Sequence, residues 1–140
     1  MRGYIGDTLV NYLINRNYDV TVYDNLLYND HYFKNVPFIY GDIRDTNKLL
    51  KACQDCDVIV LLAALVGDAA SSLNTKVTEE INYEAVKNIC EKLPKDKFVI
   101  FFSSASVYGY IQDLVDEKGE TNPLSLYRRY KVKSRETCFR

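Results

Sequence analysis

The apolar stretches DVIVLL at residues 57–62 and KFVIFFS at residues 97–103 decide the fold. Consecutive apolar positions of this length are typical of a parallel strand that is buried on both faces of its sheet. The segment between them, residues 77–93, carries apolar side chains at helical spacing, namely Ile81, Ala85, Ile89 and Leu93. Strand, helix and strand in this order predict an α/β fold with crossover helices.

The same alternation extends toward both ends of the chain. Further strands are predicted at residues 18–23 and 37–40, and further helices at residues 6–16, 46–53 and 127–140. Stretches without periodicity, at residues 25–35, 64–74 and 105–126, each follow a predicted strand. Ligands bind beyond the carboxyl ends of strands in an open parallel sheet, so these loops are functional candidates. The alternative is that they are tolerated surface insertions.

Composition limits the class of protein. The 140 residues fit one domain, with 47% hydrophobic and 26% charged residues. Eighteen Lys and Arg against nineteen Asp and Glu give a net charge of −1, which disfavours a nucleic-acid groove or a polybasic membrane patch and favours a small-molecule partner. No apolar run reaches the roughly 18 residues of a membrane span, and no signal-peptide layout is present. We therefore expect a cytoplasmic protein without nucleic-acid or membrane partners.

The four cysteines raise the question of a metal or redox site. Cys53 and Cys56 have C-x-x-C spacing, but Cys90 and Cys138 are distant in sequence and His31 lies in an unrelated polar loop. A structural zinc site needs two more thiolates or imidazoles at short spacing, so no metal is expected. Ordinary packing at a helix end is the favoured interpretation of the C-x-x-C pair, with a redox pair as the alternative.

Glycines near the N-terminus suggest a phosphate-binding turn. Gly3-Tyr4-Ile5-Gly6 matches the second half of a G-x-x-G-x-x-G loop, in which glycines let a pyrophosphate approach the positive end of a helix. A helix follows, and the next strand ends in Asp24, about 20 residues on, where an acid receives the ribose hydroxyls of a dinucleotide. A strand-end turn is the alternative role for Asp24.

Taken in order, six motifs carry a family resemblance. They are Gly3-Tyr4-Ile5-Gly6, the strand end Val20 to Leu26, Gly41-Asp42-Ile43-Arg44-Asp45, Leu62-Ala63-Ala64, Ser103 to Gly109, and Tyr127-x-x-x-Lys131. The chain resembles the extended short-chain dehydrogenases/reductases of the NAD-dependent nucleotide-sugar epimerase/dehydratase family over essentially all 140 residues. The resemblance implies a Rossmann-like doubly wound parallel sheet, with residues 1–140 forming part of an NAD-binding domain that includes the catalytic elements.

The resemblance also implies site residues. Cofactor-binding residues would be Gly3, Tyr4, Ile5 and Gly6 at the pyrophosphate, Asp24 and Asn25 at the adenosine ribose, Asp42 and Ile43 at the adenine, and Ala63, Ala64 and Lys131 along the cofactor. Ser104, Tyr127 and Lys131 would form the catalytic set. Asn82 matches an asparagine that orders the active site, with helix packing as the alternative. The carboxylate of Asp24 favours NAD over NADP because it would repel a ribose phosphate.

The spacing of Tyr127 and Lys131 suits proton transfer. Residues four apart share one face of a helix, so the ammonium of Lys131 would lower the pKa of the Tyr127 phenol. Tyr127 could then take a proton from a sugar hydroxyl as hydride leaves the same carbon, while Ser104 steadies the charge on the sugar oxygen. Without the other motifs this pair would be interpreted as part of a solvated helix face. Ser103 and Ser106 are assigned to loop capping.

The resemblance also indicates which of the family's reactions is favoured and which parts of the family's fold are absent from these residues. Dehydratases tend to carry an acidic pair where this chain has Ala105 and Ser106, so epimerisation or keto-sugar reduction of a nucleotide-sugar is favoured. The first strand and the C-terminal substrate region of the family have no counterpart here. We expect a gap in the strand order 3-2-1-4-5, low stability, little activity and impaired homodimerisation. The alternatives are a non-catalytic NAD-binding module and an assembly module completed by a partner's strand.

Overall fold

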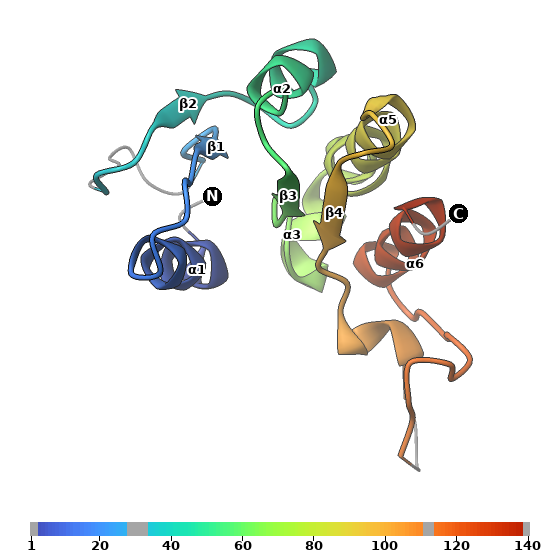
Figure 1. The fold of residues 1–140 in the computed structure, drawn as a ribbon. Coiled ribbons are helices and arrows are strands. Elements are labelled where there is room, and N and C mark those ends of the chain that lie inside the picture. The colour runs from blue at the N-terminus through green and yellow to red at the C-terminus, as the bar shows by residue number, and fades with distance from the viewer. Residues whose placement is uncertain (1–2, 28–33, 111–113, 139–140) are drawn as a thin grey trace.

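A computed structural model describes residues 3–27, 34–110 and 114–138 of the chain. It has the predicted α/β class, with helices and strands alternating along the sequence (Figure 1). In chain order the elements are α1 (Tyr4–Ile14), β1 (Val22–Asp24), β2 (Phe38–Tyr40), α2 (Thr46–Ala52), β3 (Val58–Leu61), α3 (Asp68–Leu73), α4 (Thr75–Glu79), the π-helical turn η1 (Glu80–Glu84), α5 (Ala85–Lys92), β4 (Phe98–Phe101), the 3-10 turn η2 (Ala105–Tyr108) and α6 (Leu126–Cys138).

The strands form two separate parallel pairs. β1 pairs with β2, with Val22 opposite Phe38, and β3 pairs with β4, with Val58 opposite Phe98. Across the molecule the order is β2, β1, β3 and β4, and no strand within the described residues joins the two pairs (Figure 1). This is the predicted strand order with the expected gap. The first paired strand is shorter than predicted and shifted toward its end. Of the predicted residues 18–23, only 22 and 23 pair, together with Asp24, because the neighbouring strand β2 has three residues.

The core lies between the β3–β4 pair and the helices on one of its faces. Ile59 and Leu61 of β3 pack there against Val86 and Ile89 of α5, which are almost completely buried. Burial of a Leu or Ile side chain contributes about 1.5 to 3 kcal/mol relative to exposure. This part of the chain therefore holds most of the apolar driving force for folding.

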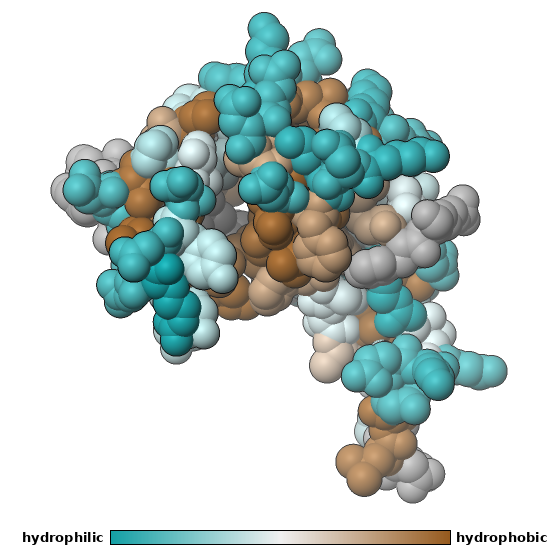
Figure 2. All heavy atoms as spheres, in the orientation of Figure 1, coloured by the Kyte–Doolittle hydropathy of each residue, from teal (hydrophilic) through white to brown (hydrophobic). Residues whose placement is uncertain are grey.

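The prediction that these two strands are buried on both faces is wrong. Phe98 is 66% exposed and Ile100 38%, and Val58 on β3 is also exposed, so the strands alternate between a covered and an open face. Figure 2 shows apolar atoms in the centre of the view, where Figure 1 places β3 and β4. The physical reason is that the described helices cover one face of this pair, where Ile59 and Leu61 share the core with Ile89 of α5, and leave the face of Val58 and Phe98 open.

Two helical segments differ from the sequence interpretation. Residues 68–73, predicted as irregular, form the short helix α3, which the sequence conceals because its Ala and Ser residues have no apolar period. It starts after Gly67, whose φ of 92° is a conformation that favours glycine. The helix predicted at 77–93 begins earlier, at Thr75, and passes through the π-helical turn η1 before continuing as α5.

The cysteines separate into two groups. Cys90 on α5 and Cys138 at the end of α6 form a disulfide with a Cα–Cα distance of 5.5 Å, although 48 positions separate them in sequence. Cys53 is buried and Cys56 partly buried, both as free thiols. The described ranges contain no group of three or more His, Cys, Asp or Glu suited to a metal, and His31 lies outside them. None of their helices has the length and apolar character to cross a membrane.

Candidate active site

Ser104 and Tyr127 come together from different elements. Ser104 follows β4 and caps the turn η2, where its Oγ accepts a hydrogen bond from the Ser106 amide at 3.3 Å and lies 2.7 Å from the Ser106 Oγ. Tyr127 stands in the first turn of α6. A hydrogen bond between the Ser104 hydroxyl and the Tyr127 phenol acts to lower the pKa of the phenol. A strand end and a helix start are therefore joined at one polar contact.

Lys131 lies one helical turn further along α6, in a buried position. It is only 5% exposed, and its Nζ donates a hydrogen bond to the Phe102 carbonyl at 2.8 Å. The same Nζ is 4.7 Å from the Phe101 ring centroid and 5.9 Å from that of Tyr127. Burial lowers the pKa of Lys131 to about 8, because an apolar environment disfavours the ammonium. The three predicted catalytic residues thus form one cluster.

The pKa of Tyr127 moves in the direction opposite to the sequence expectation. Burial of the phenol raises its pKa above the ordinary value, and the negative charge of Asp68 raises it further, against the lowering effect of Ser104. Lys131 does not offset these effects, since its ammonium is directed to the Phe102 carbonyl. The expected depression of the Tyr127 pKa by Lys131 is therefore not found in this structure.

Asn82 ties the active-site helix to the loop that follows β3. It lies buried in η1, where its side chain accepts a hydrogen bond from the Leu65 amide at 2.8 Å and donates one to the Leu65 carbonyl at 2.9 Å. Its own backbone carbonyl accepts a hydrogen bond from the Ser134 hydroxyl of α6 at 2.7 Å. A π-helical turn often marks a functional position in a helix. Sequence reasoning missed Ser134, for which no motif gave a signal.

The predicted phosphate-binding residues open α1. Gly3 is the N-cap, with extended backbone and no side-chain cap, and Tyr4, Ile5 and Gly6 form the first turn. Amide groups at a helix start attract anions, and here no capping side chain competes for them. Asp7 in the same turn forms an ion pair with Lys34 at 3.0 Å, which neutralises its charge near the helix start.

Asp24, Asn25 and Asp42 gather at the ends of β1 and β2. The Asp24 carbonyl accepts a hydrogen bond from the Gly41 amide at 3.0 Å, and its buried carboxylate accepts one from the Leu26 amide at 2.7 Å. This second bond is the strand-end turn considered as the alternative role for Asp24. Asn25 contributes a hydrogen bond that lowers the pKa of Asp42. The predicted ribose and adenine residues are therefore neighbours.

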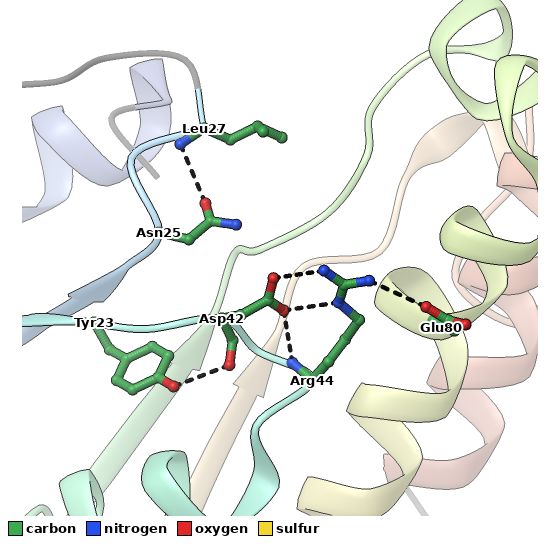
Figure 3. A network of polar contacts seen from close by, with 6 residues as sticks. All are labelled: Tyr23, Asn25, Leu27, Asp42, Arg44 and Glu80. Carbon is green, nitrogen blue, oxygen red and sulfur yellow. Dashed lines mark hydrogen bonds and ion pairs between the residues drawn. The ribbon is translucent and has the colours of Figure 1, made fainter.

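Arg44 is a polar residue whose role sequence reasoning missed. Its guanidinium donates to both carboxylate oxygens of Asp42, at 3.0 and 2.8 Å, and reaches Glu80 at 3.1 Å (Figure 3). These bonds are the main cause that holds the pKa of Asp42 below its usual range. The Tyr23 hydroxyl donates to the Asp42 carbonyl at 2.9 Å and fixes its backbone (Figure 3).

The remaining predicted residues have apolar side chains that are buried or partly buried. The side chain of Ile43 belongs to the buried core, Ala64 is buried and Ala63 is partly buried against the core. The place beneath the cofactor that the resemblance implies for Ala63 and Ala64 stays a prediction.

Comparison with known proteins decides the family. A model of the "NAD dependent epimerase/dehydratase family" matches residues 1–140. The chain belongs to this family. A Methanocaldococcus jannaschii protein named "Putative UDP-glucose 4-epimerase" is 36% identical over 132 residues, which is 89% of this chain and 43% of that protein. A UDP-N-acetyl-alpha-D-glucosaminuronate decarboxylase of Bacillus cytotoxicus is 32% identical over 113 residues, covering 76% of this chain and 35% of the decarboxylase.

Solved structures of epimerases share the fold of this family member. The UDP-glucose 4-epimerase from Brucella ovis, in complex with NAD, superposes with a TM-score of 0.86 at 26% identity, covering 96% of this chain and 43% of that one. The chain thus spans less than half the length of the curated relatives it matches. The Rossmann-like α/β architecture expected from the sequence is confirmed by this superposition.

Proposed function

We propose that this chain carries the NAD-binding and proton-transferring part of a nucleotide-sugar epimerase. The observation that carries the proposal is the cluster of Ser104, Tyr127 and Lys131 at the carboxyl end of β4. A hydroxyl, a phenol and a buried amine at one place can exchange a proton with a sugar hydroxyl. Family membership and the epimerases among its relatives support a UDP-sugar as substrate.

NAD fits the residues that the structure places at the other strand ends. Gly3 leaves the first amides of α1 without a side-chain cap, and such amides suit a pyrophosphate. Asp24 ends β1 with a buried carboxylate, which suits ribose hydroxyls and disfavours a ribose phosphate. Asn25 and Asp42 lie beside it, where they would contact the adenosine. When bound, NAD supplies the hydride acceptor for the reaction.

The proton transfers fall to the residues of this chain. Tyr127, as phenolate, takes the proton of the sugar hydroxyl, and the same phenol returns it when the keto sugar is reduced on its other face. Ser104 donates a hydrogen bond to the reacting sugar oxygen. Burial lowers the pKa of Lys131 to about 8 and raises that of Tyr127, so the two values lie further apart than in the free side chains. The phenolate therefore needs a further positive charge nearby, which the oxidised nicotinamide of bound NAD would supply.

Epimerisation or keto-sugar reduction is proposed over dehydration. The two positions after Ser104 are Ala105 and Ser106, which lack the acid and base that removal of water requires. Homodimerisation and a cytoplasmic location stay predictions.

The test is turnover of UDP-glucose by the protein as its natural source produces it, with Tyr127→Phe as the variant. Loss of the phenol hydroxyl should lower kcat by about 100-fold or more, with NAD binding unchanged in calorimetry. Tyr18→Phe, at an exposed tyrosine, is the matched control and should retain full activity. Undiminished turnover by Tyr127→Phe would exclude Tyr127 as the base. Failure to bind NAD would exclude the proposal as a whole.

A further inference from the structure

Asp68, the first residue of α3, contacts the start of the active-site helix α6. One carboxylate oxygen accepts a hydrogen bond from the Ser125 hydroxyl at 2.6 Å, and the other forms an ion pair with the Arg128 guanidinium at 3.3 Å. In sequence, Ser125 lies two positions before Tyr127 and Arg128 directly follows it. The carboxylate of Asp68, 57 positions from Ser125 and 60 from Arg128, therefore holds residues on both sides of the proposed base.

Ser125 passes this contact on to the helix backbone. Its carbonyl accepts a hydrogen bond from the Arg129 amide at 3.0 Å, which closes the first turn of α6. Its hydroxyl oxygen accepts one from the Arg128 amide at 3.5 Å while donating to Asp68. The first turn of α6, which contains Tyr127, is thereby fixed relative to α3.

We propose that Asp68 is a positioning residue for Tyr127, which holds the first turn of α6 against α3 and sets the electrostatic field at the phenol. This inference rests on the proposed role of Tyr127. It assigns to Asp68 no contact with the substrate and no proton transfer.

The groups that face the Tyr127 phenol define the expected signs. Ser104 comes from the end of β4, Lys131 from the same helix, Asp68 from α3, and Arg128 is paired with Asp68. The charge of Asp68 raises the pKa of Tyr127. Arg128 neutralises part of that charge through the ion pair. Removal of the carboxylate should therefore lower the pKa of Tyr127, and removal of the guanidinium should raise it.

These opposite signs separate an electrostatic role from mere loosening. If loss of either contact only freed the helix, the phenol would become more hydrated in both variants, and its pKa would fall in both. The experiment titrates the ultraviolet absorbance of tyrosinate in the wild-type chain, Asp68→Asn and Arg128→Gln. Since the chain has twelve tyrosines, a Tyr127→Phe partner in each background isolates the signal of Tyr127 by subtraction.

The expected result is a fall of about 0.5 pH units for Asp68→Asn and a rise of a few tenths for Arg128→Gln, the size expected of a partly exposed charge. Asp68→Glu keeps the charge and should restore a value near wild type. Asp96→Asn, which removes the same charge from an exposed loop before β4, should change nothing. A fall in both variants, or no change in Asp68→Asn, overturns the proposal.

The titration needs neither cofactor nor turnover, so its outcome is independent of the test of the proposed function. If Asp68→Asn does not fold, the comparison of Arg128→Gln with wild type still decides the sign, because an unchanged or lowered pKa in that variant contradicts the proposal.

Discussion

The part of the molecule built on β3 and β4 differs sharply from the part built on β1 and β2. Around β3 and β4, side chains such as Val86 and Ile89 are 1% and 0% exposed. The helix α1 beside β1 and β2 contains no buried residue, and its tyrosines Tyr4 and Tyr12 are exposed. Burial of apolar side chains therefore stabilises the part around β3 and β4 much more than it stabilises α1 and its surroundings.

The proposed functional residues divide along the same line. Ser104, Tyr127 and Lys131 belong to the well-packed part, whose geometry is set by buried side chains. The residues proposed for NAD, Gly3 and Asp24 among them, belong mostly to the part with little buried surface. A site that carries out proton transfer needs fixed distances, whereas a cofactor-binding segment gains order from the cofactor itself. The comparison thus predicts where substitutions cost most.

The largest effect is expected for Ile89→Ala. This side chain is fully buried in α5, so its truncation should lower the free energy of unfolding by about 4 kcal/mol through lost burial and a cavity. Ile14→Ala is the matched change in α1, where the side chain is only partly buried, and should cost about 1 kcal/mol. Urea unfolding of both variants gives the two values. Equal losses would contradict the difference between the two parts.

The next effect is expected for Asn82→Ala. Two hydrogen bonds to the backbone of the partly buried Leu65 are lost. The Leu65 carbonyl keeps the Ser71 hydroxyl at 3.3 Å, whereas its amide loses the Asn82 oxygen, so the change should cost about 2 kcal/mol. Asn88→Ala on α5 is the control, since Asn88 is partly exposed, and should cost less than about 1 kcal/mol. Both are measured by urea unfolding. A loss for Asn82→Ala no greater than the control's would show that the Leu65 backbone finds other partners.

The sequence predicted the positions of candidate site residues correctly where these positions depend only on strand ends and on helical spacing. The positions of Ser104 after β4 and Asp24 at the end of β1 follow from parallel topology, which puts all carboxyl strand ends on one side. The proximity of Tyr127 and Lys131 follows from their separation by four residues on one helix. These inferences need only local periodicity and the order of elements.

Contacts between segments that are distant in the chain could not be predicted from the sequence. The ion pair of Asp68 with Arg128 and the hydrogen bond of Ser134 to Asn82 join residues more than 50 positions apart, and no spacing rule links them. The exposed face at Phe98 was missed for another reason. An apolar run shows that a strand can be buried on both faces, but the covering elements decide whether it is.

Lys131 gives a pH-dependent prediction for the well-packed part. Its pKa is about 8 in the folded chain and near the ordinary 10.5 when unfolded, so the unfolded state binds more protons between these values. The contribution of Lys131 to stability should therefore rise by about 2 kcal/mol as the pH increases from about 8 toward 10. The raised pKa values of Tyr127 and Tyr130 act oppositely above pH 10, where unfolded tyrosines ionise first.

The check is urea unfolding of wild type and Lys131→Met across this pH range. The variant should lack the rise, because methionine keeps the buried chain without a titrating amine. Parallel pH curves for the two proteins would show that Lys131 is charged equally in both states.

The smallest effect is expected where the two parts meet. Arg44 links Asp42, one of the proposed NAD residues, to Glu80 of the π-helical turn, and all three side chains are substantially exposed to solvent. Exposed ion pairs contribute little, so Arg44→Gln should lower the free energy of unfolding by less than about 1 kcal/mol at low salt. The loss should shrink further in about 1 M salt, which screens the charges. Arg129→Gln, at an exposed arginine of α6, is the control and should show no salt-dependent loss. A loss above about 2 kcal/mol that persists in high salt would mean that this link, and not the core around β3 and β4, holds the two parts together.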